Sequence, residues 1–243
     1  MRVPRVYVAD PLRVGDTLSL AEAQSHYLGK VLRMEPGRAL VVFNGDGREY
    51  GASITQVSKR SVDIHILEMR EAQRESPLHT HLAIGISRGE RMDWVLQKAT
   101  ELGVSMITPL FTERTEVRLQ GERLAKKMEH WRQITISACE QCQRAVLPEL
   151  VDAVDLNEFL AAGPPGLKLV LHHRSDQSIK QLPVPETVTL LVGPEGGLSD
   201  QEIERAMTTF HYTPLTLGPR VLRTETAPLA ALTAVQLLWG DLG

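Results

Sequence analysis

The sequence is short of cysteine and of long apolar runs, and each shortage excludes a class of protein. Two cysteines among 243 residues exclude a disulfide framework and favour an intracellular, cytoplasmic protein. The longest apolar stretch, residues 227–239, includes Thr233 and Gln236 and is shorter than the roughly 20 residues that span a membrane. The first residues, MRVPRVYVADP, lack the apolar region of a signal peptide. We therefore expect a protein that does not associate with membranes.

Net charge and metal ligands are also scarce. The formal charge is −3, although residues 1–70 carry 10 Lys and Arg against 8 Asp and Glu, which is a weak hint of nucleic-acid binding. Cys139 and Cys142 close a long helical pattern without a second cysteine pair, which favours side-chain packing over a zinc site. No Gly-Lys-Ser/Thr phosphate loop and no nucleophile elbow occur, so phosphate and acyl-transfer chemistry find no support. We expect no bound metal.

Residues 1–70 show short strand patterns and one helical pattern. Strands are expected near 3–8, 39–43, 50–57 and 61–67, with a helix over 21–32. Short strands joined by glycine turns are typical of a small barrel. The charged segment 71–77 ends in proline and is expected to be a linker.

The remaining residues alternate strand and helix patterns. Strands are expected at 80–86, 104–110, 167–171, 187–192 and 213–217, and helices at 90–102, 122–143, 157–162 and 225–239. Ser199 and Glu202 have the spacing of a capping box, which predicts another helix start. This alternation predicts an α/β domain with a mostly parallel sheet and helices on both faces.

Two glycine-rich loops are the strongest functional signal. LLVGPEGGLSDQE (190–202) and LTLGPRVLRTETA (215–227) each follow an apolar strand and lead into a helix. Glycines let a ligand approach the backbone closely, and strand ends of an α/β sheet form a natural crevice. Arginine does not suit the positive end of a helix, so Arg220 and Arg223 are expected to face a ligand, whereas Glu225 suits that position.

With these motifs, the chain resembles the RsmE family of small-subunit ribosomal RNA methyltransferases from end to end. The shared motifs include HYLGKVLRMEPG, SRGERMDWVLQKATELGV, SACEQCQR, LLVGPEGGLS and LGPRVLRTETA. The resemblance implies a PUA-like RNA-binding β-barrel over residues 1–72 and a SPOUT-type domain with a trefoil knot over 73–243. It also implies a homodimer formed through the second domain.

The resemblance further implies S-adenosylmethionine as cofactor and methylation of N3 of a uridine in the small-subunit (16S) ribosomal RNA. The implied cofactor residues are Leu171, His172, Gly193, Pro194, Glu195, Gly196, Gly197, Leu217, Gly218, Leu222 and Thr226.

Three groups of charged residues are candidates for the chemistry and for RNA contacts. A carboxylate, Glu195, Glu225 or Glu101, is a candidate to take the uridine proton. A cation, Arg223 or Arg88, is a candidate to stabilise the uridine anion. Arg2, Arg5, Lys30 and Arg33 are candidates to contact ribosomal RNA or the assembled small subunit.

Two alternatives stay open at this point. One is a ribose 2′-hydroxyl methyltransferase of the same superfamily. The other is an RNA-binding assembly factor without catalytic activity, against which the intact glycine loops argue.

Overall fold

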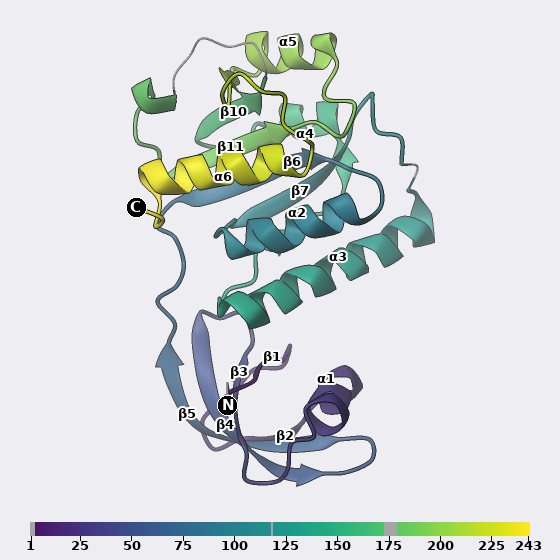
Figure 1. The fold of residues 1–243 in the computed structure, drawn as a ribbon, viewed down its shortest axis with the longest axis vertical. Helices are drawn as coiled ribbons and strands as arrows, with labels where there is room; N and C mark the ends of the chain where they lie inside the picture. Colours follow the sequence, from purple (N-terminus) through teal and green to yellow (C-terminus); the bar gives the residue numbers. More distant parts are fainter. Residues whose placement is uncertain (1–2, 118, 173–178) are drawn as a thin grey trace. The chain divides into compact units, whose positions relative to one another are not determined.

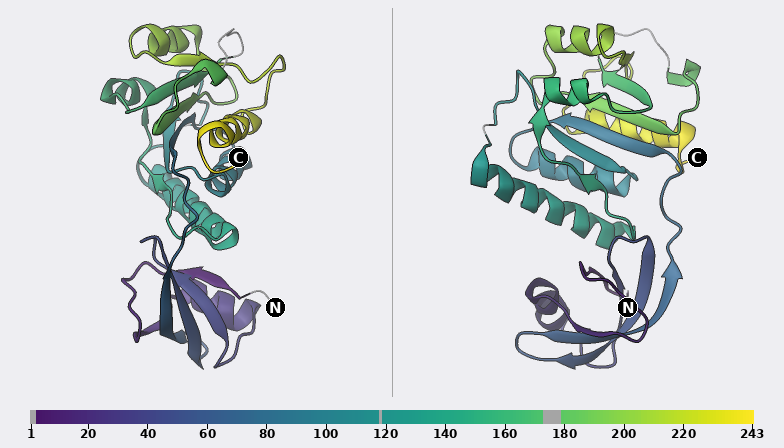
Figure 2. Two further views of the ribbon diagram at one scale, coloured as in Figure 1. Left: turned by 90° about the vertical axis from the view of Figure 1, so that its left-hand side faces the viewer. Right: turned by 180° about the vertical axis from the view of Figure 1, so that it is seen from behind.

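The chain folds into two compact units in a computed structural model that describes residues 3–117, 119–172 and 179–243 (Figures 1 and 2). The first unit comprises residues 1–75 and 139–147, and the second comprises 76–138 and 148–243. The expected single boundary between residues 72 and 73 stays a prediction. The return of residues 139–147 to the first unit is a feature that the sequence analysis did not include.

The first unit is a five-stranded mixed sheet with one short helical segment. The strand order is β1-β3-β4-β5-β2, in which β1 pairs parallel with β3 and the other pairs are antiparallel. The strands are β1 (Arg5–Tyr7), β2 (Thr17–Ser19), β3 (Ala39–Phe43), β4 (Arg48–Val57) and β5 (Val62–Glu71). The expected helix is α1 (Glu22–His26), which continues as the π-helix η1 (Tyr27–Val31).

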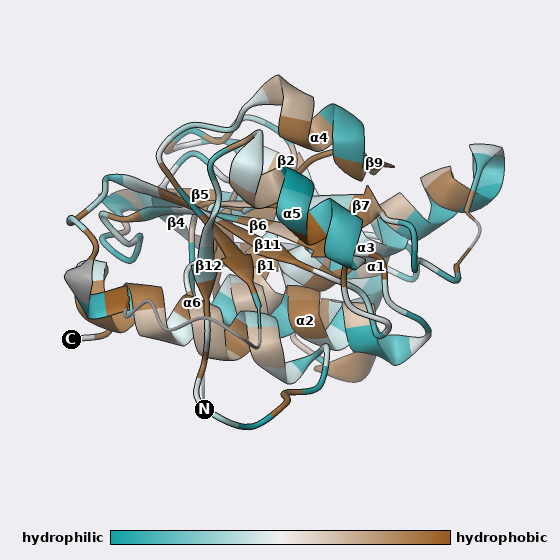
Figure 3. Ribbon diagram, turned by 90° about the horizontal axis from the view of Figure 1, so that it is seen from above, coloured by the Kyte–Doolittle hydropathy of each residue, from teal (hydrophilic) through white to brown (hydrophobic). Residues whose placement is uncertain are grey.

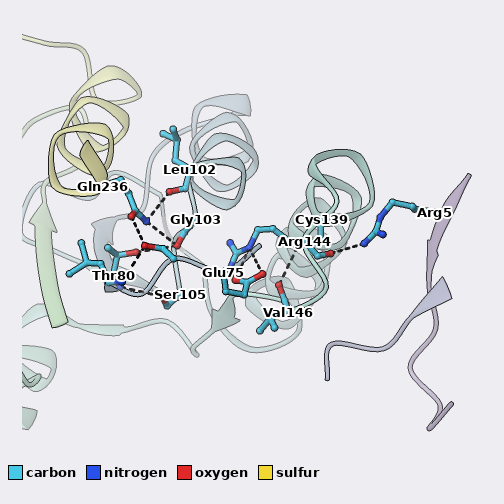
Figure 4. Close-up of polar contacts among 12 residues, drawn as sticks. Arg5, Glu75, Thr80, Leu102, Gly103, Ser105, Cys139, Arg144, Val146 and Gln236 are labelled. Atoms are coloured by element: carbon cyan, nitrogen blue, oxygen red, sulfur yellow. Dashed lines mark hydrogen bonds and ion pairs between the residues drawn. The ribbon is translucent and has the colours of Figure 1, made fainter. Parts of the chain in front are cut away.

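Residues 139–147 complete the first unit. Cys139 and Ala145 are buried against Phe43 in a small core of their own. The Glu140 carboxylate accepts a hydrogen bond from the Tyr7 amide at 2.9 Å, and the Arg144 guanidinium donates to Glu75 at 2.6 Å (Figure 4). The C-x-x-C pair therefore serves packing at the end of a helix, as the sequence indicated.

The second unit is built on a seven-stranded parallel sheet. Its order is β12-β10-β11-β6-β7-β8, and β9 also pairs with β7. The strands are β6 (His79–Gly85), β7 (Met106–Phe111), β8 (Glu149–Leu150), β9 (Val154–Asp155), β10 (Leu167–Leu171), β11 (Thr187–Val192) and β12 (Thr213–Leu215). The helices are α2 (Glu90–Glu101), α3 (Gly121–Cys142), α4 (Leu156–Ala162), α5 (Asp200–Thr208) and α6 (Thr226–Trp239), with a 3-10 turn η2 (Ile179–Gln181).

Helices cover both faces of this sheet. Successive strand residues point to opposite sides, so each face presents apolar side chains that a helix layer can bury. In β11, Leu190 and Val192 join a core with residues of α2, α3 and α6, whereas Leu191 joins a second core with residues of α4 and α5. Figure 3 shows the apolar strands between the two helical layers. The predicted α/β architecture with a parallel sheet is confirmed.

A buried glutamine fixes α6 against the loop that follows α2. Gln236 donates to the carbonyls of Leu102 and Gly103 at 3.2 and 3.4 Å and accepts from the Ser76 hydroxyl at 2.7 Å (Figure 4). Burying an unpaired amide is costly, so this set of partners specifies one position for the helix.

Within the described residues, no helix is long and apolar enough to cross a membrane. Over the same part of the chain, no group of three or more His, Cys, Asp or Glu lies close enough to hold a metal ion.

Candidate functional site

The carboxyl end of β10 and the loops that follow β11 and β12 line a cavity of about 340 Å³. These strands are neighbours in the sheet, so their ends meet at one edge although they are distant in the sequence. The cavity is lined by Arg114, Leu171, His172, Val192, Gly193, Pro194, Glu195, Gly196, Gly197, Leu198, Asp200, Ile203, Leu215, Thr216, Leu217, Gly218, Arg220, Val221, Leu222, Thr224 and Ala227.

The first glycine loop, residues 193–199, is tightly folded. A Cβ atom on Gly193 would lie 2.5 Å from the Leu198 nitrogen, and Gly197 has a φ of +69° that disfavours other residues. The Gly197 amide donates to the Pro194 carbonyl at 2.8 Å and closes the turn. Ser199 then caps α5 in a reciprocal box with Glu202, as the spacing predicted.

The second glycine loop, residues 216–225, is tied to its neighbours through threonines. The Thr224 hydroxyl donates to the Gly193 carbonyl at 3.2 Å, which joins the two glycine loops. The Thr216 hydroxyl donates to the His172 carbonyl at 2.8 Å, and the His172 amide donates to the Leu215 carbonyl at 3.0 Å. Hydrogen bonds therefore join the second glycine loop both to the first and to the end of β10.

Arg114 is a wall residue that the sequence analysis missed. Its guanidinium donates to the carbonyls of Gly196 and Leu198 at 2.8 and 3.3 Å. A Cβ atom on Gly196 would lie 3.1 Å from the Arg114 Cβ, so Gly196 has little room on that side. The TER motif that contains Arg114 lies between β7 and α3 and carries no local sign of this contact, because Gly196 is 82 positions away.

Glu195 is held from the start of α2. Its Oε1 accepts from the Arg88 amide at 2.7 Å and from the Arg91 guanidinium at 2.9 Å. Burial acts to raise the pKa of Glu195, but hydrogen bonds from the backbone amides of Arg88 and Glu195 and from Arg91 outweigh it and hold the pKa below its usual value. A carboxylate stabilised in this way is a weak base.

The other predicted catalytic residues are not among those that line the cavity. Glu225 is half-buried at the N-cap position of α6, with its Oε2 3.9 Å from the Arg91 Nε. The Arg223 side chain is exposed on the second glycine loop. The Arg88 guanidinium pairs with Glu116. Glu101 pairs with Lys98 at 2.7 Å at the far end of α2, so its candidacy as a base is not supported by its position.

Ten of the eleven predicted cofactor residues line the cavity. The exception is Thr226, the first residue of α6, whose neighbours Thr224 and Ala227 contribute instead. The cavity residues outside the prediction come from the same loops, from Arg114, from the last residues of β11 and β12, and from the helices α5 and α6.

The predicted RNA contacts need one correction. The Arg5 side chain is 7% exposed, pairs with the buried carboxylate of Glu49 and donates to the Arg144 carbonyl at 3.0 Å. Arg5 is therefore part of the first unit's interior and is not available to RNA. Lys30 and Arg33 are exposed, as an RNA contact requires. Arg2 lies outside the described residues.

Both units match known protein families. The RNA methyltransferase domain family matches residues 74–236, and the RNA methyltransferase PUA domain family matches residues 20–67. The chain belongs to the RsmE family of small-subunit ribosomal RNA methyltransferases. The ribosomal RNA small subunit methyltransferase E of Buchnera aphidicola (Schizaphis graminum) is 38% identical over 99% of this chain and 98% of its own.

Solved structures agree with this membership. A methyltransferase of Legionella pneumophila with bound S-adenosylmethionine matches with a TM-score of 0.96 and 47% identity, covering both chains fully. The RsmE protein of Neisseria gonorrhoeae, also bound to S-adenosylmethionine, matches with a TM-score of 0.93 and 38% identity, again over both full chains. RsmE membership confirms the predicted RNA methyltransferase and its PUA domain.

The cavity of this RsmE protein fits such a cofactor on its own geometry. Its volume of about 340 Å³ lies in the usual range for small-molecule sites. Glycines in two of its walls place no side chain between the backbone and a ligand, and Leu171, Leu217 and Leu222 provide apolar surface for a flat ring.

Proposed function

We propose that this protein transfers the methyl group of S-adenosylmethionine to N3 of a uridine in small-subunit ribosomal RNA. The observation that carries the proposal is the cavity formed by both glycine loops, which contains ten of the residues expected to bind that cofactor. When bound, S-adenosylmethionine would supply a methyl group on a positively charged sulfur: a nitrogen electron pair forms a bond to the methyl carbon as the carbon–sulfur bond breaks and the neutral thioether leaves.

The residues around the cavity suit the removal of one proton. Uridine N3 is mostly protonated at neutral pH, so a base must take its proton as the new bond forms. Glu225 suits this role better than Glu195, because the Glu195 carboxylate is already occupied by Arg91 and the Arg88 amide. Arg223, exposed on the same loop, suits stabilisation of the negative charge that develops on the uracil oxygens.

The test is methyl transfer from radiolabelled S-adenosylmethionine to isolated small ribosomal subunits, followed by digestion and mass spectrometry of the nucleosides. Methylation of the uracil base is the expected result. A ribose-methylated nucleoside would establish the 2′-hydroxyl alternative, and no transfer together with retained RNA binding would establish an assembly factor. Glu225→Gln is expected to lower kcat by at least tenfold, whereas Glu204→Gln, a change at an exposed site on α5, serves as control.

The proposal includes a homodimer formed through the second unit. Leu237 and Leu238 of α6 and Trp94 of α2 are 58%, 38% and 51% exposed, which is unusual for large apolar side chains on helices that neighbour each other. A second copy of this chain would cover them. Sedimentation equilibrium is expected to give twice the chain mass, and Leu237→Asp is expected to shift it towards the monomer.

The proposed RNA face lies on η1 of the first unit. Lys30 of η1 and Arg33, two residues beyond its end, are exposed, and Tyr27 of η1 is 43% exposed and suits stacking on a base. Changing both cations to alanine is expected to weaken RNA binding and reduce its salt dependence. Arg13→Ala, at another exposed site of the unit, is the control.

Three further expectations belong to the same proposal. They are the trefoil knot in the second unit, the division into an RNA-binding domain (residues 1–72) and a methyltransferase domain (residues 73–243), and a cytoplasmic location. The RsmE membership supports all three.

A further inference from the structure

Arg91 contacts both glycine loops from an element that contributes no wall to the cavity. Its Nη1 lies 2.9 Å from Oε1 of Glu195 in the first loop, and its Nε lies 3.9 Å from Oε2 of Glu225 at the end of the second. The two carboxylates are 30 positions apart in the sequence. One guanidinium can serve both because its donors are spread over a rigid plane.

These contacts close a ring around one side of the cavity. Arg91 joins α2 to the first loop through Glu195, Thr224 joins the first loop to the second through the Gly193 carbonyl at 3.2 Å, and Glu225 returns to Arg91. The Arg88 amide adds a second bond to Glu195. Removing Arg91 opens the ring at two places at once.

The backbone underneath this ring is packed without spare room. A Cβ atom on Gly85, at the end of β6, would lie 2.4 Å from Pro194 Cδ and 2.5 Å from the Pro194 nitrogen. The first glycine loop therefore rests directly on the strand that leads to α2. A side chain from the start of α2 is then close enough to reach over that loop.

The position of Arg91 is unfavourable for a helix considered alone. It lies in the first turn of α2, where the helix dipole favours acidic side chains and disfavours a cation. Two carboxylates from other segments offset this cost. Residues that contradict local preference in this way are found at sites where a specific arrangement is needed.

We propose that Arg91 is a positioning residue that fixes the two glycine loops to the start of α2 and thereby sets the affinity of the cavity for S-adenosylmethionine. The inference rests on the proposed function, because it assumes that this cavity holds that cofactor. Arg91 itself is not a wall of the cavity and is not assigned a chemical step.

The test measures cofactor binding directly by titration calorimetry, with S-adenosylmethionine and with its demethylated product. Arg91→Ala is expected to weaken both about three- to tenfold, a size typical of partly exposed ion pairs that act together. Arg91→Lys places a single point charge near one carboxylate and is expected to give an intermediate affinity. Arg132→Ala removes an arginine from an exposed pair with Glu129 on α3 and is expected to change nothing.

Two further measurements separate positioning from general stability. In steady-state kinetics Arg91→Ala is expected to raise KM for the cofactor while KM for RNA stays unchanged. The double variant of Arg91→Ala with Glu195→Gln is expected to weaken binding by less than the two single effects combined, because each single change already removes the contact between Arg91 and Glu195. If Arg91→Ala does not fold, the cofactor affinities of Arg91→Lys and Glu195→Gln are compared with that of the wild-type protein instead.

The inference is overturned if wild-type protein binds the cofactor and the Arg91 variants bind it equally well, or if Arg91→Ala and Glu195→Gln weaken binding additively. If wild-type protein binds neither form of the cofactor, the proposed function is wrong, and this inference, which depends on it, is wrong as well.

Discussion

At the scale of single residues, the site depends on positions where a side chain has no room. Gly193 is one, because its missing Cβ would meet the Leu198 nitrogen at 2.5 Å and the Gly197 carbonyl carbon at 2.6 Å. Both are backbone atoms, which cannot rotate away as the end of a flexible side chain can. The first glycine loop is therefore closed on itself at Gly193, and its shape depends on that contact.

Gly193→Ala is accordingly expected to lower the free energy of unfolding by about 1–3 kcal/mol, the usual cost of overpacking. It is also expected to weaken cofactor binding, since the loop has to open. Urea denaturation and calorimetry measure the two effects. Gly29→Ala is a matched control, because a Cβ there meets only ordinary contacts at 3.5 and 3.6 Å. Equal effects at the two positions would contradict the steric explanation.

His81 predicts a pH dependence of stability. It is buried in β6 with its Nε2 2.8 Å from the Thr108 hydroxyl, and burial, with a smaller effect of His79, lowers the pKa of His81 to about 4. An unfolded histidine takes up its proton near pH 6.5, so the unfolded chain binds more protons between these values. The free energy of unfolding is expected to fall by about 3 kcal/mol as the pH is lowered from 7 to 4.

This part of the pH dependence is expected to be absent in His81→Gln. Urea denaturation of both proteins at a series of pH values between 4 and 7 measures the difference. If the free energy of unfolding changes with pH in the same way in both proteins, His81 is not the source of this pH dependence.

At the scale of elements, α5 shows how one helix end supports a loop. Ser199 accepts from the Glu202 amide at 3.2 Å, and the Glu202 carboxylate accepts from the Ser199 amide at 2.7 Å. Glu202 also accepts from the Glu113 amide at 2.8 Å. The cap thus fixes the end of the first glycine loop as well as the start of α5.

Ser199→Ala is expected to lower the free energy of unfolding by about 1 kcal/mol, the usual value of such a cap. Amide hydrogen exchange is expected to become faster in residues 200–204. Thr208→Ala, which removes a hydroxyl from the other end of the same helix, is the control. Equal exchange in the two variants would show that the cap does not hold this end.

The elements also show what the sequence can predict. Patterns within a few residues predicted the capping box, the helices α2 and α3 and the strands that end at the cavity. They did not predict the contact of Arg91 with Glu195 or of Arg114 with Gly196, because the partners are 104 and 82 positions apart. Arg5 fails as an RNA contact for the same reason, since its partner Glu49 comes from another strand.

At the scale of the whole molecule, the division into units does not follow the order of the sequence. Residues 139–147 provide Cys139 and Ala145 to the core around Phe43 and the Glu140 carboxylate to the Tyr7 amide. A fragment that ends after β5, the last strand of the first unit, therefore lacks part of that unit.

A fragment of residues 1–75 is expected to be about 2–4 kcal/mol less stable than the same unit in the intact chain, because an aromatic side chain loses its partners. Circular dichroism during urea denaturation measures this. A peptide spanning residues 136–150 is expected to restore part of the loss, and a scrambled peptide is not. A fragment as stable as the intact unit would show that the returning segment only covers it.

The returning segment also matters while the protein is being made. Cys139 follows Glu75 by 64 positions, which at ordinary rates of synthesis is a delay of about 3–13 s. During that interval the nascent chain carries Phe43 without its two buried neighbours, and Tyr7 without its carboxylate partner. The unit that is synthesised first is completed only by the end of α3 and the residues after it, so its apolar surface is open to chaperones and to misassembly during that interval.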